Sequence, residues 1–397
     1  MGEKRKDSKG RILNKGETQR KDGSYMYTYK DVNGKKKCIY SWRLVPSDKH
    51  LNGKNRGDSL REKETKILQD LREGICSDDR LTVIDLVDKY LSTKNGVRVS
   101  TKKEYLSYRE NLRKESFCSR RAVKVKMSDA KQFFSELYNR GMSYGYITNL
   151  KIILKAAFQI AVDDDMLRKN PFAFRLDSVI PNNSERRQAL NPEEERKFLE
   201  YVLSDNCFRK QYDSMVILLG TGLRISEFAG LTMHDVDFDL MRVHVNHQLL
   251  KNNSRFYIEK PKTKSGERYI PMTDEVADAF RNIIANRKPN KKITVDGYTD
   301  FVVLTTQGTP ICSTNFEKNL RYIVNKYNST HEDKLPRITP HILRHTFCTK
   351  MCNLGMNITV LQYIMGHSDP SVTLRVYTHM DFNSASAEMK RVSSNVK

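Results

Sequence analysis

The stretch TPHILRHTF, residues 339–347, contains the start of a helix together with polar side chains that helix periodicity does not require. Thr339 is a typical N-cap, and Pro340 suits the first helical position because an N–H there has no helical partner. His341 and Arg344 follow three residues apart, so they share one face of the expected helix. The stretch therefore predicts a helical region that presents a histidine and an arginine side by side.

A second stretch, MGHSDPSVTLRVYTH at residues 365–379, adds a histidine and a tyrosine. Gly366 is expected to end the preceding apolar helix as its C-cap, which places His367 directly after the helix. Tyr377 follows ten residues later in a short amphipathic segment. Taken singly, a histidine usually caps a helix or faces solvent and a tyrosine usually packs its ring. Only a larger set of polar residues would therefore indicate a site.

Two stretches further upstream enlarge this set. TGLRISEFAGL (221–231) places Arg224 at a turn after an apolar helix, with Glu227 one helical turn later. KTKSGERYIP (262–271) places Lys264 in a turn between two expected strands. The four stretches together contain two arginines, two histidines, a lysine and a tyrosine outside the apolar periodicity.

These residue types suit attack on a phosphodiester bond. Arginine guanidinium groups bind the non-bridging oxygens of a phosphate through paired N–H groups and offset the charge that builds up in the transition state. Histidine and lysine transfer protons to the phosphate or to the leaving oxygen. A tyrosine hydroxyl can hold the phosphate covalently. Because that ester keeps the energy of the broken bond, the reaction needs neither a metal ion nor a nucleotide.

A metal site is the alternative for one part of this region. His345, Cys348 and Cys352 are separated by three and four residues. A Cys-x-x-x-Cys pair on a helix more often faces a core, however, and no second pair supplies the remaining ligands. The sequence also has no glycine-rich phosphate loop of either common kind. We therefore predict that the protein uses no metal and no cofactor.

The overall charge indicates a polyanionic partner. The 397 residues include 70 Lys and Arg against 48 Asp and Glu, which gives a net charge of +22 and a pI of about 9.6. Nucleic acid is the first expected partner of such a chain. A membrane is disfavoured, because the longest purely apolar run, 215–219, is much shorter than the roughly 18 residues of a spanning helix. Seven scattered cysteines and an N-terminus without an apolar signal region predict a reduced, cytoplasmic protein.

The composition also divides the chain into parts. Residues 8–46 predict a small antiparallel sheet, because tyrosines alternate with other residues over 25–29 and the Asn-Gly pair at 33–34 is a strong hairpin signal. An earlier strand is expected at 11–17. A basic helix is expected over 59–71.

The rest of the chain predicts mainly helices. Apolar residues recur at helical spacing within 80–173, and Ser128 is expected to cap one of these helices. Residues 174–189 are polar, contain a proline and predict an interdomain linker. Residues 190–397 mix helices with expected strands and predict a mixed α+β, mostly helical domain. The expected strands are 237–246, 256–260 and 267–272.

At the four quoted stretches the sequence resembles the tyrosine recombinases of the lambda-integrase family. The order of the stretches, the His-x-x-Arg spacing and the spacing from Gly-His-Ser to tyrosine all agree with the family pattern, and the match is highly specific. The N-terminal sheet resembles the arm-binding domain of integrases from Gram-positive conjugative transposons. This resemblance implies a site-specific DNA recombinase that cuts and rejoins DNA through a 3′-phosphotyrosyl intermediate and integrates and excises a mobile element.

The resemblance also assigns each part of the chain a task. It implies an arm-DNA-binding domain with a small antiparallel β-sheet over 1–72 and an all-helical core-DNA-binding domain over 80–173. A linker over 174–189 leads to a tyrosine-recombinase catalytic domain with a C-terminal tail over 190–397.

Carried over residue by residue, the resemblance implies six catalytic residues. Tyr377 is similar to the nucleophile that attacks the scissile phosphate. Arg224 and Arg344 match the pair that clamps this phosphate. Glu227 matches an acidic position that braces the site.

The other three catalytic residues bind or transfer protons. His341 and His367 match the first and second histidines of the family pattern. Lys264 resembles the lysine that protonates the leaving oxygen. Lys262 is two residues away and would point to the same face of a strand, so it stays open as an alternative.

The resemblance further implies partners. These are double-stranded DNA at core and arm sites, three further copies of the chain in a homo-tetramer on DNA, an excision-directing accessory protein and a DNA-bending host protein. The expected location is the nucleoid in the bacterial cytoplasm. Two alternatives compete with this interpretation. The complete set of six residues disfavours a non-enzymatic DNA-binding regulator, and the additional N-terminal domain and short C-terminal tail disfavour a topoisomerase.

Overall fold

The computed structural model describes residues 5–31, 34–49, 57–72, 80–184, 188–252, 255–261, 263–287 and 293–371, together with Leu374, Ser386, Met389 and Ser393. Its contacts divide the chain into two compact units, residues 1–185 and 186–397. Among the described residues, no helix has both the length and the apolar character that crossing a membrane requires.

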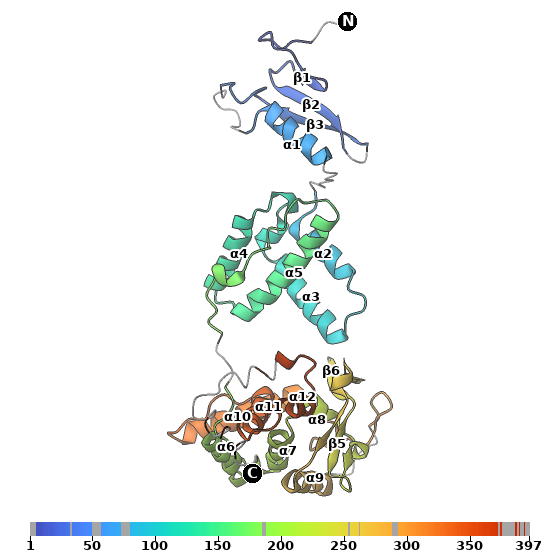
Figure 1. Cartoon of the computed structure of the whole chain (residues 1–397), viewed down its shortest axis with the longest axis vertical. Helices are drawn as coiled ribbons and strands as arrows, with labels where there is room; N and C mark the ends of the chain where they lie inside the picture. The colour runs from blue at the N-terminus through green and yellow to red at the C-terminus, as the bar shows by residue number, and fades with distance from the viewer. Residues whose placement is uncertain are drawn as a thin grey trace. The chain divides into compact units, whose positions relative to one another are not determined.

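The first unit begins with a three-stranded antiparallel sheet of order β1-β2-β3 (Figure 1). The strands are β1 (Glu17–Gln19), β2 (Tyr25–Lys30) and β3 (Lys36–Ser41), and α1 (Leu60–Arg72) packs against β2 and β3. Buried apolar side chains form a small core here: Tyr25, Tyr27, Leu44 and Leu60. The predicted sheet and basic helix are confirmed.

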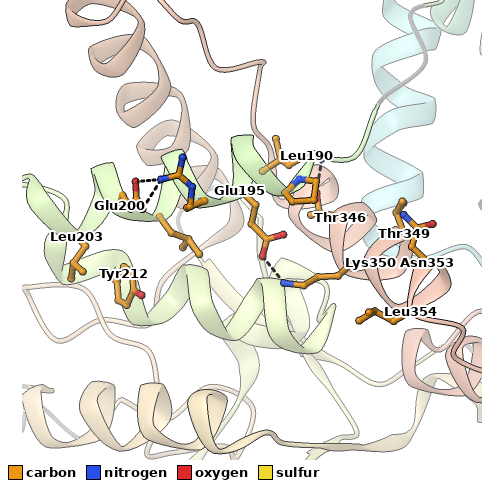
Figure 2. Close-up of a pocket in the computed structure, with 13 residues that line it drawn as sticks. Leu190, Glu195, Glu200, Leu203, Tyr212, Thr346, Thr349, Lys350, Asn353 and Leu354 are labelled. Atoms are coloured by element: carbon orange, nitrogen blue, oxygen red, sulfur yellow. Dashed lines mark hydrogen bonds and ion pairs between the residues drawn. The ribbon is translucent and has the colours of Figure 1, made fainter.

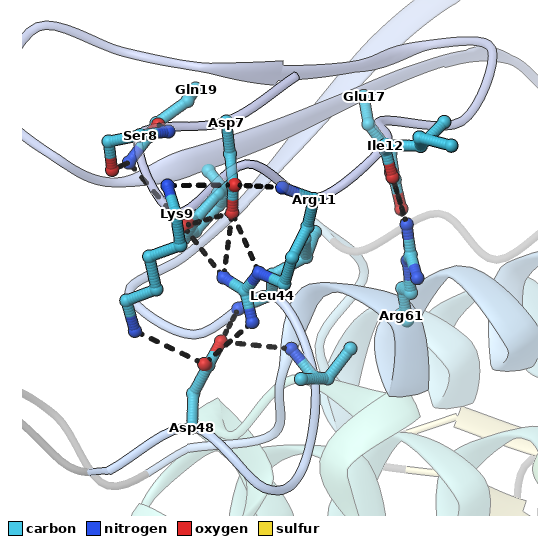
Figure 3. A network of polar contacts seen from close by, with 12 residues as sticks. Asp7, Ser8, Lys9, Arg11, Ile12, Glu17, Gln19, Leu44, Asp48 and Arg61 are labelled. Carbon is cyan, nitrogen blue, oxygen red and sulfur yellow. Dashed lines mark hydrogen bonds and ion pairs between the residues drawn. The ribbon is translucent and has the colours of Figure 1, made fainter. Parts of the chain in front are cut away.

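The segment before β1 folds back through a network of ion pairs (Figure 3). The Arg11 guanidinium donates to Asp7 Oδ2 at 2.8 Å and to Asp48 Oδ1 at 2.7 Å. Lys9 Nζ donates to the same Asp48 oxygen at 3.3 Å. We call these four residues the Arg11 network. They hold the segment in a turn, which explains why the strand expected at 11–17 forms later in the chain.

Four helices form the rest of the first unit. They are α2 (Val83–Ser92), α3 (Val99–Arg113), α4 (Met127–Asn139) and α5 (Tyr144–Asp163). The apolar positions of α5 are buried at the predicted helical spacing. The sequence pattern does not predict α3, because this polar helix buries only Leu112.

Two details of this helical part differ from the prediction. Lys126, not Ser128, occupies the N-cap of α4, and the Asp129 carboxylate accepts the Lys126 N–H at 2.8 Å. Leu176 and Ile180 belong to the segment predicted to be a linker, yet both are buried in the helical core. Apolar residues of that segment therefore help to stabilise the first unit.

The second unit is built around α7, whose apolar residues are mostly buried and which contacts α6, α9 and α11. The predicted N-cap Thr339 is confirmed at the start of α11, and Asn191 caps α6 in the same way. The helices of this unit are α6 (Pro192–Ser204), α7 (Tyr212–Thr221), α8 (Ile225–Gly230), α9 (Asp274–Asn286), α10 (Ser313–Thr330), α11 (Pro340–Asn353) and α12 (Ile358–Met365).

Its strands are β4 (Val236–Asp237), β5 (Arg242–Val245), β6 (Gln248–Asn252), β7 (Arg255–Glu259) and β8 (Arg268–Pro271). They form a sheet of order β4-β5-β8 and a separate pair β6-β7. The strand expected at 237–246 is therefore a hairpin, because Leu240 N–H donates to Asp237 Oδ1 in its turn. Since β7 and β8 belong to different sheets, the turn Lys264–Gly266 connects two sheets and does not close a hairpin.

Candidate active site

The end of α7 positions the first arginine. Gly222 takes the left-handed conformation with φ +64°, and a Cβ there would lie 2.4 Å from the Phe347 ring of α11. Both the backbone and the close approach of the helices therefore require glycine. Arg224 follows at the N-cap of α8. Its backbone N–H donates to Glu227 Oε2 at 3.0 Å, and its Nη1 donates to Oε1 at 2.6 Å.

Arg344 reaches the same place from α11, where its side chain is buried. Its Nη1 donates to the carbonyl oxygen of Gly222 at 2.6 Å. Its Nη2 donates to the carbonyl oxygen of Met365 and lies 3.0 Å from His367 Nε2. Because a guanidinium only donates, this histidine nitrogen is the acceptor.

The end of α12 positions His367. Gly366 is the predicted left-handed C-cap, with φ +60°. The backbone N–H of His367 donates to Gln362 O at 3.2 Å, and Gln362 Nε2 donates to His367 O at 3.1 Å. Burial and the charges of Arg344 and Arg224 lower the pKa of His367 from 6.5 to about 4. The imidazole is therefore neutral near pH 7.

A third arginine, Arg268 of β8, is fully buried behind the other two. Its Nη1 and Nη2 donate to Glu227 Oε1 at 3.2 Å and Oε2 at 2.9 Å. Its Nε donates to Ile364 O at 2.6 Å, and Nη1 also donates to Gly266 O at 3.1 Å. Arg268 does not stand out in the sequence as a site residue. The available signal was its two-residue spacing from Ile270, which places both on the buried face of a strand.

Arg224, Arg268, Arg344, Glu227 and His367 form one group, which we call the Glu227 cluster. Three guanidinium groups against one carboxylate leave a surplus of two positive charges (3 − 1 = 2). Burial alone would raise the pKa of Glu227, but Arg268 and Arg224 outweigh burial and lower it to about 2. Burial and Arg224 lower the pKa of Arg344 to about 9, so this side chain stays charged near pH 7. Such a cluster favours a bound anion.

The structure thus brings three of the six predicted site residues together. Arg224 donates to the Gly366 carbonyl and Arg344 to the Met365 carbonyl. Arg344 also contacts His367, the next residue in the chain after Gly366.

The remaining predicted residues are placed only by their position in a helix or a turn, or lie outside the described residues. His341 is the second residue of α11, on its exposed side. Lys264 begins the turn whose last carbonyl, that of Gly266, accepts a hydrogen bond from the Glu227 cluster. Tyr377 and the alternative lysine Lys262 lie outside the described residues. The roles of all these residues stay predictions.

A pocket of about 600 Å³ lies apart from the cluster, between α6, α7 and α11 (Figure 2). Its wall is mainly apolar, with Leu190, Leu203 and Leu354. An ion pair joins Lys350 Nζ to Glu195 Oε1 at 2.8 Å within the lining. No member of the Glu227 cluster lines this pocket, and its balanced charge does not suit a phosphate.

The residues that raised the metal alternative are His345, Cys348 and Cys352. Both cysteines are buried in the apolar core of the second unit. Within the described ranges, no three His, Cys, Asp or Glu side chains are grouped as metal ligands. That the protein uses no metal stays a prediction.

Two protein-family models match the chain. The model of the phage integrase family matches residues 188–384, and a model described as the DNA binding domain of tn916 integrase matches residues 1–71. The chain belongs to the phage integrase family and is a tyrosine-type site-specific recombinase.

Individual relatives show which kind of tyrosine recombinase the chain resembles. The chain is similar to the transposase from transposon Tn1545 of Streptococcus pneumoniae and to the transposase from transposon Tn916 of Enterococcus faecalis. Each is 44% identical over 395 residues, which cover 99% of this chain and 98% of the relative. The Tn1549 transposon integrase, solved in complex with a circular intermediate DNA, is 44% identical with a TM-score of 0.75. That match covers 79% of this chain and 99% of the solved one. The resemblance to integrases of conjugative transposons is confirmed.

Proposed function

We propose that the Glu227 cluster binds the scissile phosphate of DNA and that Tyr377 is the nucleophile that attacks it. One observation carries this proposal. Arg224, Arg344 and His367 converge from segments up to 142 residues apart and leave positive charge unpaired by carboxylate. Guanidinium groups fixed in this way would stabilise the additional negative charge of a pentacoordinate phosphate without moving during the reaction.

Cleavage would be a transesterification. The Tyr377 hydroxyl gives its proton to water and its oxygen attacks phosphorus, so a 3′-phosphotyrosyl bond forms while the bond to the 5′-oxygen breaks. Lys264 gives a proton to that leaving oxygen. A 5′-hydroxyl from another strand then attacks the phosphotyrosine and releases the enzyme. Because each step exchanges one phosphoester for another, the cycle consumes no nucleotide.

The two histidines would complete the contacts to the phosphate. Binding of an anion between Arg224 and Arg344 would offset the repulsion that lowers the pKa of His367. His367 then donates a hydrogen bond to a non-bridging oxygen. His341, one helical turn from Arg344, supplies a second donor.

The test is a nicked DNA duplex that carries the end sequence of the element encoding this chain, so that the cut strand diffuses away and the covalent adduct accumulates. Wild type should form a protein–DNA adduct on a denaturing gel without metal or ATP, and mass spectrometry should place the phosphate on Tyr377. Tyr377→Phe should bind the DNA and form no adduct. Tyr322→Phe removes an exposed tyrosine hydroxyl of the same unit and should leave adduct formation unchanged. An adduct on Tyr377→Phe would place the nucleophile elsewhere.

We further propose that the recombinase integrates and excises a mobile element and acts in the bacterial cytoplasm. Two sets of relatives support this, the Tn1545 and Tn916 transposases and the DNA-bound Tn1549 integrase. The assembly would be a homo-tetramer on double-stranded DNA, with an excision-directing accessory protein and a DNA-bending host protein. Relaxation of supercoiled plasmid without any recombinant product would instead favour a topoisomerase.

The proposed division of labour is arm-site binding by 1–72, core-site binding by 80–173, a linker over 174–189 and catalysis by 190–397. Its test is deletion of residues 1–72. The shortened protein should cleave core-site DNA at the wild-type rate and lose arm-site binding in a mobility-shift assay. Retention of full arm-site affinity would overturn the assignment.

A further inference from the structure

Arg268 is not among the residues to which the reaction assigns a role, yet its guanidinium contacts three segments that carry such residues. It donates twice to the Glu227 carboxylate, once to Ile364 O and once to Gly266 O. The Arg268 side chain makes these four donor contacts and has no exposed surface, so water does not contact its guanidinium. Arg268 therefore cannot touch DNA itself and acts only through its neighbours.

The contact to Ile364 fixes the end of α12. The last carbonyls of a helix have no partner within the helix, and Arg268 Nε binds one of them at 2.6 Å. The chain passes from there through Gly366 to His367. A Cβ at Gly366 would lie only 2.9 Å from Arg268 Nη1, so the guanidinium packs directly on this glycine.

The contact to Gly266 fixes the turn that begins at Lys264. The turn is closed by Gly266 N–H donating to Thr263 O at 2.9 Å, and a Cβ at Gly266 would lie 2.5 Å from the Pro261 side chain. Arg268 Nη1 binds Gly266 O and Glu227 Oε1 at once. One nitrogen thus links this turn to the carboxylate that orients Arg224.

We propose that Arg268 is a positioning residue of the recombination reaction. Its guanidinium holds the turn of Lys264, the carboxylate partner of Arg224 and the chain that leads to His367 in one arrangement. This inference rests on the proposed roles of those three residues.

Stability alone does not explain a buried arginine at this place. Desolvation of a buried ion pair costs about as much as the attraction returns, and well-packed apolar residues often stabilise a fold equally well. The planar fork, however, directs donors to a carboxylate, a helix end and a turn simultaneously. Lysine has a single ammonium group and cannot reproduce these directions.

The test compares the full-length variants Arg268→Met and Arg268→Lys with Arg242→Met. Arg242 lies on the adjacent strand β5 and pairs with Asp237 outside the cluster, so it is a matched control. Single-turnover cleavage is measured at saturating protein on the nicked duplex, with either oxygen or sulfur at the 5′-bridging position. A sulfur leaving group needs little protonation, so it bypasses a misplaced proton donor. Melting temperatures and DNA affinity are measured for every variant.

Arg268→Met should slow cleavage of the oxygen substrate by about 100-fold while DNA affinity stays within about threefold of wild type. Sulfur should recover part of this loss, as the proposed role of Lys264 also predicts for Lys264→Ala. Arg268→Lys should recover little, and Arg242→Met should cleave like wild type. Wild-type rates in Arg268→Met, full recovery in Arg268→Lys, or a defect without any response to sulfur would each overturn the proposal.

If Arg268→Met unfolds at the assay temperature, Gly366→Ala is used in its place. Gly366→Ala keeps the buried charge of Arg268 and displaces its guanidinium. Gly297→Ala is its control, since Gly297 also has a positive φ but open space around its Cα. Only Gly366→Ala should show the slow, sulfur-responsive cleavage, and equal rates in the two variants would overturn the proposal. If wild type forms no adduct, the proposed function fails. If wild type forms it and Arg268→Met cleaves normally, only the role of Arg268 fails.

Discussion

The Arg11 network and the Glu227 cluster both bring cationic side chains together with carboxylates, but they differ in charge balance. In the first, Lys9 and Arg11 face Asp7 and Asp48, so two cations meet two carboxylates. In the second, Arg224 and Arg268 pair with Glu227, whose charge also acts on Arg344, and no second carboxylate among the described residues pairs with these guanidinium groups. A balanced network has no remaining demand for a ligand and stabilises the turn that it closes. The unbalanced cluster retains repulsion that a bound anion would relieve.

The difference in charge balance suggests that the charged side chains of the two places serve different purposes, stability in the first and function in the second. Ion pairs on a surface contribute little stability, and a buried surplus of like charge is unfavourable for the fold. A protein keeps such a surplus where function requires it. The contrast predicts that mutations in the two places affect different properties.

The largest effect is expected for Arg344→Met. This change removes a guanidinium that would contact the phosphate, so cleavage in the adduct assay should fall by about 100- to 1,000-fold. The control is Arg281→Met, which removes an exposed arginine that pairs with Asp278 in α9. If both variants cleave equally well, the charge surplus has no catalytic meaning.

Arg11→Met should affect stability instead. It leaves the carboxylates of Asp7 and Asp48 without their shared guanidinium and should lower the free energy of opening of the N-terminal sheet by about 1–3 kcal/mol. Hydrogen exchange of peptides from β1 to β3 in the full-length protein measures this change. Cleavage of core-site DNA should remain at the wild-type rate. Arg20→Met, which removes a half-exposed partner of Asp22, should change neither property.

The smallest effects are opposite responses to pH around α12, which carries part of the Glu227 cluster, and around α1, which packs on the N-terminal sheet. Folding lowers the pKa of His367 from 6.5 to about 4, so the unfolded state binds more protons between these values. Stability around α12 should therefore fall by at most about 2 kcal/mol from pH 7 to pH 5. Burial and the neighbouring Glu17 raise the pKa of Glu64 from 4.5 to about 7. There the folded state binds more protons, and stability around α1 should fall as pH rises from 5 to 8.

Hydrogen exchange, corrected for intrinsic rates, should show these two slopes in different peptides. His367→Gln should abolish the first slope and Glu64→Gln the second. Around Glu64, the other ionisable groups are Glu17, Arg61 and Tyr27, whose own shifts lie outside this pH window. Slopes of the same sign in both regions would contradict the comparison.

Much of the fold follows from local sequence patterns. The apolar spacing of α5, the cap at Thr339 and the C-cap at Gly366 depend on neighbours in the chain, and all three were predictable. The helix α3 was not, because its polar sequence buries only Leu112. The pairing of β5 with β8 depends on tertiary packing and leaves no mark in either strand alone.

In the site, too, some residues are predictable from the sequence and others depend on tertiary packing. Arg224, Arg344 and His367 could be selected because their residue types stand out from the apolar periodicity and match a family pattern. Arg268 could not be ranked in this way, since arginine on a short strand is usually exposed. Its burial arises only when Glu227 and the end of α12 come together around it.

The Glu227 cluster also joins segments that leave the ribosome at very different times. Arg224 binds Gly366 across 142 residues, and Arg344 binds Gly222 across 122. Since domains fold in order during synthesis, the N-terminal sheet can form while the ribosome is still translating the second unit. The Glu227 cluster cannot form before α12 has emerged. Under the proposed roles, nascent and prematurely terminated chains would have a folded N-terminal sheet before they have a complete phosphate-binding site.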